Sequence, residues 1–411
     1  MTTNQKQSYL FPMIVMSVLF FMVGFITTMN NSLIDFLSSS KWMLTFAEKQ
    51  FINTAFFSAY VFSIPLSYLL NKMGYKPSAV LSLFVIGGGF ILVFPAVKLG
   101  YIAFLLAMFL VALGIALLQI VLNPYVLALG APETAASRLN LTGFLNSVAT
   151  VIAPLFVGMM ISAGNIIPNA PVESRPDATN VQGPFLIIAG ITLALFAILY
   201  FLKLPDIKEE ETSGSVGKKY LDSPFKYPHL IFGSLAIFAY MGVEIGIPSF
   251  LPDRAKSLGL EIDVTKLLSF YWGGLMVGRL LGSAILQKVR ARTALLVCIF
   301  TSVALLAVSL LTTGMLSVSL LIGTGLCHSI MWANIFNLAS EDLGPHAKRA
   351  SGIICTAVIG GAILPPLMGN LQQSFGANAV TTGTIVALSC LFIYYGYIAL
   401  FAGKLSKIRP A

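Results

Sequence analysis

The chain has 411 residues, of which 57% are hydrophobic and only 10% are charged, and its formal net charge is +9. Charged residues make up about a quarter of an ordinary soluble chain, so this composition excludes a soluble domain and indicates a lipid environment. The apolar stretches are long and continuous, which excludes the alternating pattern of a membrane β-barrel. The basic residues lie singly or in small groups between these stretches, so they indicate membrane topology, and no nucleic-acid partner is expected.

The apolar stretches predict an all-α membrane protein with twelve transmembrane helices, because each approaches the ~20 residues needed to cross a bilayer. Residues 1–9 are polar, and the stretch after them is long enough to remain as a span, so no cleavable signal peptide is expected. The predicted spans are 10–36, 50–71, 78–97, 101–129, 137–162, 184–203, 228–252, 265–287, 292–313, 316–340, 349–374 and 379–402.

The predicted spans divide into two six-helix halves, 1–203 and 228–411, joined by a polar cytoplasmic linker at 204–227. An offset of 211 residues relates the halves and aligns the fourth span with the tenth and the fifth with the eleventh. Parallel six-helix repeats of this kind are the arrangement of the major facilitator fold. The matches at this offset are Gly114 with Gly325, Asn123 with Asn334, Arg138 with Arg349, Pro154 with Pro365, and Gly158 with Gly369.

Lys and Arg are distributed unequally between the two sides of the predicted membrane. With the N-terminus inside, the cytoplasmic segments hold seventeen of these residues and the outer segments hold seven. This excess predicts that both termini are cytoplasmic. Arg138 and Arg349 begin the fifth and eleventh spans, and we expect either matching gates at the cytoplasmic side or topology signals alone.

Polar side chains inside the predicted spans mark a candidate site, because a polar group that faces lipid is costly. Asn31 and Asp35 lie one helical turn apart on the first span, as do Gln119 and Asn123 on the fourth, and Asn146 lies on the fifth. Amides supply donors and acceptors together, which suits a solute with many hydroxyl groups. For each amide two interpretations stay open: contact with a substrate, or a hydrogen bond between helices.

The second half adds two amides on the tenth span, Asn334 and Asn337, and the mid-span ring of Trp272. An aromatic ring can stack on the apolar face of a sugar, and packing between helices is the alternative. Asn123 and Asn334 occupy matching places, which favours a role in preserving the fold. The predicted substrate-binding set is Asn31, Gln119, Asn123, Asn146, Trp272, Asn334 and Asn337.

Glu244 is the one acid of sixteen that lies well inside a span, whereas Asp35 is close to the outer end of the first span. A carboxyl group at such a depth suits an ion-coupling site for a proton or a sodium ion. The alternative is a structural acid paired with Arg279 of the eighth span. His328 offers a proton relay, although a neutral packed imidazole is the favoured interpretation.

Chemistry-bearing clusters are absent from the sequence. It contains no nucleophile–base pair, metal-ligand cluster or nucleotide-binding loop, so no enzyme activity, metal or cofactor is expected. All four cysteines fall inside predicted spans, where we expect them to be small packing residues. They are Cys298, Cys327, Cys355 and Cys390.

Four segments resemble the signature of the fucose–galactose–glucose:proton symporter family. They are 123–126 (NPYV), 137–142 (SRLNLT), 269–279 (SFYWGGLMVGR) and 360–369 (GGAILPPLMG). The resemblance extends from about residue 10 to residue 403. It implies alternating access and import of a hexose or related sugar across a bacterial inner membrane, and we expect a monomer.

The family's fucose branch carries acids at the positions of Asn31 and Gln119. Gln119 is similar to the glucose/galactose branch, and the segment 30–33 is closer to N-acetylglucosamine-type members. Glu244 has the position of an acid found in many glucose-like relatives, which implies that ion coupling has moved there. An uncoupled facilitator and an exporter of sugars or drugs are the alternatives with the same fold.

Overall fold

The computed structural model describes residues 9–40, 42, 44, 46–160, 177–205 and 220–410. Within these residues the chain is helical and contains no β-strand. Ten helical stretches are long and apolar enough to cross a membrane. The other two predicted spans are also helical, one at residues 46–73 and one at 264–285. The prediction of twelve transmembrane helices is therefore confirmed.

The second span of the first half is divided rather than continuous. A 3-10 turn at Ala59–Phe62 separates its two helices, and Pro65 follows directly. Pro65 has no N–H for the carbonyl four residues earlier, so the α-helical ladder is interrupted here. The helices of this half are α1 (Leu10–Ser39), α2 (Phe46–Ser58), α3 (Ser63–Met73), α4 (Tyr75–Leu99), α5 (Tyr101–Ala128), α6 (Ala135–Met160) and α7 (Gln182–Phe201).

Three spans of the second half are also divided into shorter helices. The tenth breaks between His328 and Met331, and the eleventh contains a 3-10 turn at Ala357–Ile359. The helices are α9 (Pro228–Ser257), α10 (Val264–Ile285), α11 (Ala291–Leu311), α12 (Gly314–His328), α13 (Met331–Ser340), α14 (Ala347–Thr356), α15 (Gly360–Gln373), α16 (Thr384–Ser389) and α17 (Leu391–Gly403).

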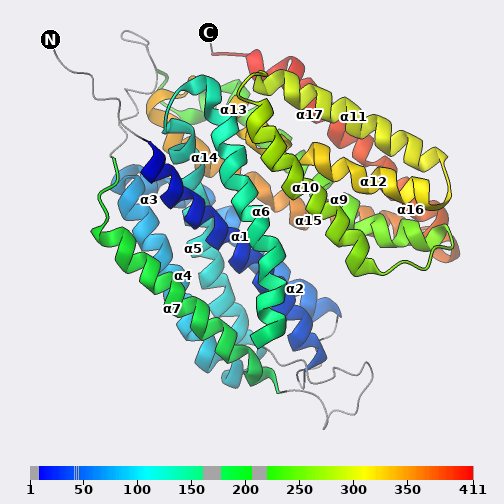
Figure 1. The fold of residues 1–411 in the computed structure, drawn as a ribbon, viewed down its shortest axis with the longest axis horizontal. Coiled ribbons are helices and arrows are strands. Elements are labelled where there is room, and N and C mark those ends of the chain that lie inside the picture. Colours follow the sequence, from blue (N-terminus) through cyan, green and yellow to red (C-terminus); the bar gives the residue numbers. More distant parts are fainter. Residues whose placement is uncertain are drawn as a thin grey trace.

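The helices form two bundles, one from each half, that meet along one side (Figure 1). At this contact α6 packs along α10, and α14 packs against α3 and α5. The first turn of α1 and the last turn of α17 lie at the same end of the molecule (Figure 1). At that end Arg409 pairs with Glu341 at 3.0 Å and with Asp342 at 3.1 Å. Burial raises the pKa of Glu341, and the Arg409 guanidinium opposes that shift.

Glycines that match in the two halves both lie at close helix crossings, although the neighbouring helix differs: the third span for Gly114 and the eighth for Gly325. A Cβ at Gly114 would lie 3.0 Å from the Ser82 carbonyl of α4, and a Cβ at Gly325 would lie 2.5 Å from the Tyr271 carbonyl of α10. Neither crossing has room for a side chain, because small residues let helix backbones approach closely. The matching glycines thus set the distance between neighbouring helices in each bundle.

Candidate functional site

Glu244 lies in the middle of α9, at a point where the helix cannot complete its own hydrogen bonds. Pro248 has no N–H, so the Glu244 carbonyl lacks its usual partner four residues later. The hydroxyl of Tyr271 on α10 donates to this carbonyl at 2.9 Å. A side chain from a neighbouring helix therefore fixes the backbone of Glu244 and, with it, the position of the carboxyl group.

A buried chain of hydrogen bonds supports Tyr271 in turn. Nδ1 of His328 lies 2.8 Å from the Tyr271 hydroxyl, and Nε2 lies 2.6 Å from the hydroxyl of Tyr395 on α17. Tyr271 already donates its proton to the Glu244 carbonyl, so Nδ1 carries the hydrogen and Nε2 accepts from Tyr395. Both ring nitrogens of His328 therefore have buried partners, an arrangement that fits the packed imidazole favoured by the sequence interpretation.

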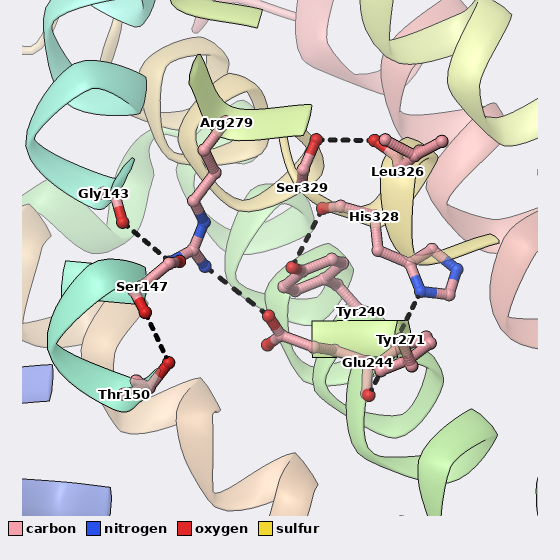
Figure 2. Close-up of polar contacts among 10 residues, drawn as sticks. All are labelled: Gly143, Ser147, Thr150, Tyr240, Glu244, Tyr271, Arg279, Leu326, His328 and Ser329. Carbon is pink, nitrogen blue, oxygen red and sulfur yellow. Dashed lines mark hydrogen bonds and ion pairs between the residues drawn. The ribbon is translucent and has the colours of Figure 1, made fainter. Parts of the chain in front are cut away.

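The carboxylate of Glu244 faces Arg279 of α10, with 3.6 Å between Oε1 and Nη2 (Figure 2). Their side chains are only 11% and 15% exposed. The hydroxyl of Tyr240, one turn earlier on α9, also lies beside this carboxylate. Opposite charges normally accompany each other at such depth, because an isolated buried charge is costly. The pairing that the sequence offered as an alternative role for Glu244 is present.

Arg279 also reaches across to the other half of the molecule. Its Nη1 donates to the Gly143 carbonyl at 3.1 Å and to the Ser147 hydroxyl at 2.8 Å, and both acceptors belong to α6 (Figure 2). Gly143 leaves space for the guanidinium, because a Cβ there would lie 3.5 Å from Cδ of Arg279. One guanidinium thus joins a carboxylate of the second half to a helix of the first.

A seam between the two halves runs from Arg279 towards the end of the molecule where α1 begins and α17 ends. At this seam two serine hydroxyls donate to backbone carbonyls across the contact: Ser351 of α14 to Ile120 at 2.8 Å, and Ser137 of α6 to Ser283. The Ile120 carbonyl has no helical partner because Pro124 follows four residues later, and Ser283 lies in the last turn of α10. Each hydroxyl therefore satisfies a carbonyl of the other half that has no hydrogen-bond donor within the carbonyl's own helix.

Close packing completes the seam. The amide of Asn123 lies 3.8 Å from Sγ of Cys355 on α14. A Cβ at Gly352 would lie 2.6 Å from the Ser63 carbonyl of α3, so α14 fits there only without a side chain. Arg349 donates to the hydroxyl of Tyr68 at 2.7 Å and stacks over its ring. The sealed seam thus rests on contacts of α14 with α3 and α5.

Arg138 has a different role from its counterpart in the repeat, Arg349. Its guanidinium donates to the carbonyls of Val126, Leu127 and Ala131 and to the hydroxyl of Thr134. These acceptors belong to the end of α5 and the loop that follows, so they satisfy groups left free at a helix terminus. Of the two arginines, Arg349 is the one whose hydrogen bonds, among the described residues, cross between the halves.

The amides of the predicted substrate-binding set separate into distinct environments. Asn123 is in the seam, and Asn146 donates to the Phe20 carbonyl of α1 at 2.9 Å, which joins two helices of one half. Asn334 is fully buried, and neither atom of its amide has a partner. Gln119 and Asn337 are half-buried. Both of these side chains are therefore partly accessible, in contrast to Asn123 and Asn334.

The remaining predicted site residues lie on other helices. Trp272 is half-buried on α10, and its ring packs edge-to-face on Tyr271 with centroids 5.1 Å apart. Tyr271, on which this ring packs, is a member of the hydrogen-bond chain beside Glu244. Asn31 and Asp35 fall within α1, but their side chains lie outside the described residues.

An apolar groove of about 200 Å³ lies elsewhere, between α1 and α7. Its lining is aliphatic and aromatic, so it offers no hydrogen bonds to a sugar. Among the described residues no group of three His, Cys, Asp or Glu side chains is arranged to hold a metal. The polar centre around Glu244 and Arg279 is therefore the candidate functional site.

The sequence interpretation did not include Tyr271, Ser147 or Ser351 in the candidate site. Their partners come from distant parts of the chain, and a serine or tyrosine in a span is common. A signal was nevertheless present, because a proline frees the carbonyl four residues earlier. Pro248 marks the carbonyl that Tyr271 satisfies, and Pro124 marks the one that Ser351 satisfies.

Comparison with known proteins identifies the family. The family model of the Major Facilitator Superfamily matches residues 16–364. The chain is 37% identical to a glucose/galactose transporter of Brucella abortus over 97% of this chain and 95% of that protein. It is 26% identical to the L-fucose-proton symporter of Escherichia coli over 95% and 93% of the two chains. A crystal structure of the transporter FucP in the outward conformation superposes with a TM-score of 0.83, covering 96% and 99% of the chains at 24% identity. The fold, the extent of the family match and these relatives together establish that the chain belongs to the major facilitator superfamily of membrane transporters.

Proposed function

We propose that this protein imports a hexose or a related sugar by alternating access, coupled to a proton or sodium ion at Glu244. The observation that carries the proposal is the buried ion pair between Glu244 and Arg279, which also contacts the opposite half. An ion can drive transport only where its binding differs between the two facing states. A carboxylate on the contact between the halves meets this requirement, because the neighbours of Arg279 change when the halves move.

The similar proteins support a sugar as the solute. Two of them are named as a glucose/galactose transporter and an L-fucose-proton symporter. Gln119, Trp272 and Asn337 are half-buried and supply amide groups and an aromatic ring, the chemistry that a sugar requires. Asn123 and Asn146 already hold other helices, so we assign them to helix contacts.

The facing state follows from topology and the seam together. The excess of Lys and Arg predicts that both termini lie in the cytoplasm of a bacterial cell, with the chain in its inner membrane. The seam lies at that end, so the structure corresponds to a carrier closed to the cytoplasm. Import then requires the halves, 1–203 and 228–411, to separate at the seam while the linker at 204–227 keeps them joined. We expect a single chain to suffice, as a monomer.

Transport measured in proteoliposomes tests the assignment of Glu244. Replacing Glu244 by Gln keeps the shape of the side chain and removes its charge. We expect Glu244→Gln protein to exchange labelled for unlabelled glucose or galactose, but not to concentrate it under an imposed proton or sodium gradient. Glu261→Gln is the matched control, because Glu261 is an exposed acid between α9 and α10.

Two outcomes would contradict the proposal. Normal accumulation by Glu244→Gln protein would exclude Glu244 as the coupling group. If the wild-type protein equilibrates sugar but accumulates it with neither ion, the protein is an uncoupled facilitator, and Glu244 serves only as the structural partner of Arg279.

A further inference from the structure

We propose that Arg279 transmits the charge of Glu244 to the seam, acting as a clasp whose hold on α6 weakens when Glu244 is ionised. This inference rests on the proposed coupling role of Glu244 and adds the route by which that charge reaches the contact between the halves. Arg279 is here a positioning residue, since its Nη1 binds α6 through Gly143 and Ser147 while its Nη2 faces Glu244.

The distances show a guanidinium shared between two competing partners. Nη1 makes hydrogen bonds of 2.8 and 3.1 Å to α6, whereas the approach of Nη2 to the carboxylate is 3.6 Å, longer than a charge-assisted hydrogen bond of about 2.7–2.9 Å. Contact with α6 therefore keeps the guanidinium from closing fully on Glu244. If α6 moves away, the same side chain is free to complete the ion pair.

The charge of Glu244 decides whether Arg279 binds more strongly to Glu244 or to α6. An ionised carboxylate attracts the guanidinium strongly at this depth, while a neutral carboxyl leaves the hydroxyl and carbonyl of α6 as the better acceptors. The polar groups that face this pair are the hydroxyls of Tyr240 and Tyr271, both buried. Arg279 is the charged group paired with Glu244 among the described residues. A proton on Glu244 thus favours the sealed seam, and loss of that proton favours its opening.

Coupling in the inward direction follows from this competition. A proton that stabilises the sealed state must, by reciprocity, be bound more firmly in that state than in the one that opens to the cytoplasm. The open state releases the proton because Arg279 has lost α6 and pairs with the carboxylate. Ser147 is the residue of α6 on which this competition depends most directly, since its hydroxyl makes the shorter of the two bonds.

The experiment measures seam opening without any transport. Cys355 is fully buried in the seam, so its alkylation by a maleimide reports opening. Cys298, Cys327 and Cys390 are replaced by alanine, and purified protein is assayed at pH 6 and pH 8. Each rate is divided by the rate for the denatured protein at the same pH, which removes the titration of the thiol itself. We expect faster alkylation at pH 8 than at pH 6 in this background.

Three variants in that background separate the possibilities. Ser147→Ala should raise the normalised alkylation rate of Cys355 at pH 6 about tenfold, which corresponds to ~1.4 kcal/mol. It should also bring the alkylation rates at pH 6 and pH 8 closer together. Glu244→Gln should give a slow rate that is independent of pH. Thr150→Ala is the matched control, because Thr150 lies on the same helix and bonds only to the Ser147 carbonyl, so its rates should be unchanged.

The inference is overturned if Ser147→Ala behaves like Thr150→Ala, or if Glu244→Gln retains the full pH dependence. Because Ser147→Ala removes a single hydroxyl, it tests the clasp even if Glu244→Gln does not fold. Failure of the clasp differs from failure of the proposed function. If Glu244→Gln abolishes the pH dependence but still accumulates sugar, the clasp stands and Glu244 is not the coupling group.

Discussion

Single side chains complete hydrogen bonds that the helices of this protein cannot make for themselves. The clearest case is the Tyr271 hydroxyl, which satisfies the Glu244 carbonyl left free by Pro248. Behind it, His328 and Tyr395 extend the chain of hydrogen bonds within the second half, from α10 to α17. A polar chain of this kind is stable because every member has a partner, and removing one member leaves its neighbours unsatisfied.

We therefore expect Tyr271→Phe to destabilise the protein by about 1–3 kcal/mol, the cost of leaving a buried polar group unpaired. The measurement is the midpoint of thermal unfolding of the purified protein in detergent. Tyr200→Phe is the control, because the Tyr200 ring is exposed on α7. Equal midpoints for the two variants would show that the Glu244 carbonyl does not depend on Tyr271.

How far the sequence predicts the site depends on how unusual each residue is for its surroundings. Glu244 and Arg279 could be found, because charges deep in spans are rare. Asn123 and Asn146 belong to a commoner class, and only the structure shows that they hold Cys355 and Phe20 instead of an open space. Amides look alike in a sequence whether they meet a helix or a solute, so their separation required tertiary contacts.

Among the helices, α14 carries most of the seam, and it packs so closely that one position admits no side chain. A Cβ at Gly352 would lie 2.6 Å from the Ser63 carbonyl of α3, which is part of the opposite half. Backbone cannot give way as a flexible side chain does. The eleventh span was predicted as one stretch, 349–374. In the structure it is divided, because α14 ends at Thr356 and α15 begins at Gly360. Sequence patterns locate such spans well, whereas the position of a break within a span depends on contacts with neighbouring helices.

Gly352→Ala should consequently weaken the sealed state by about 1–3 kcal/mol, the usual cost of overpacking. Alkylation of Cys355, normalised to the denatured protein, should become faster by about tenfold or more. The control is Gly369→Ala on α15, where an added Cβ would meet nothing within 4 Å. Equal alkylation rates of Cys355 in the two variants would contradict this prediction.

In the molecule as a whole, the second half repeats the helices of the first, but the residues through which the two halves contact each other are not repeated. The offset of 211 residues predicted two related bundles, and the matching glycines Gly114 and Gly325 both lie at close crossings, although against neighbouring helices that are not counterparts. The same offset pairs Arg138 with Arg349, but the two guanidinium groups make different contacts. Arg138 satisfies the end of α5, whereas Arg349 reaches Tyr68 of the other half.

This difference predicts opposite results for the two arginines. Arg349→Gln should open the seam and raise Cys355 alkylation by about fivefold, a modest effect because Tyr68 is partly exposed and surface charge contacts contribute about 1 kcal/mol or less. Arg138→Gln should leave alkylation unchanged but lower the midpoint of thermal unfolding. Equal increases in alkylation for both variants would support the matching gates that the sequence offered as one of two interpretations.

The carbonyls of Ile120 and Ser283 give the seam a property beyond its strength. Their own helices leave both groups free, and hydroxyls from the opposite half satisfy them. When the halves part, these carbonyls and hydroxyls need new partners, and water is the molecule available at the surface where the seam opens. Opening is therefore a hydration reaction, and its equilibrium depends on the activity of water. A solute that is excluded from the opened seam withdraws that water, so osmotic stress on the side of the membrane that the seam faces holds the seam closed.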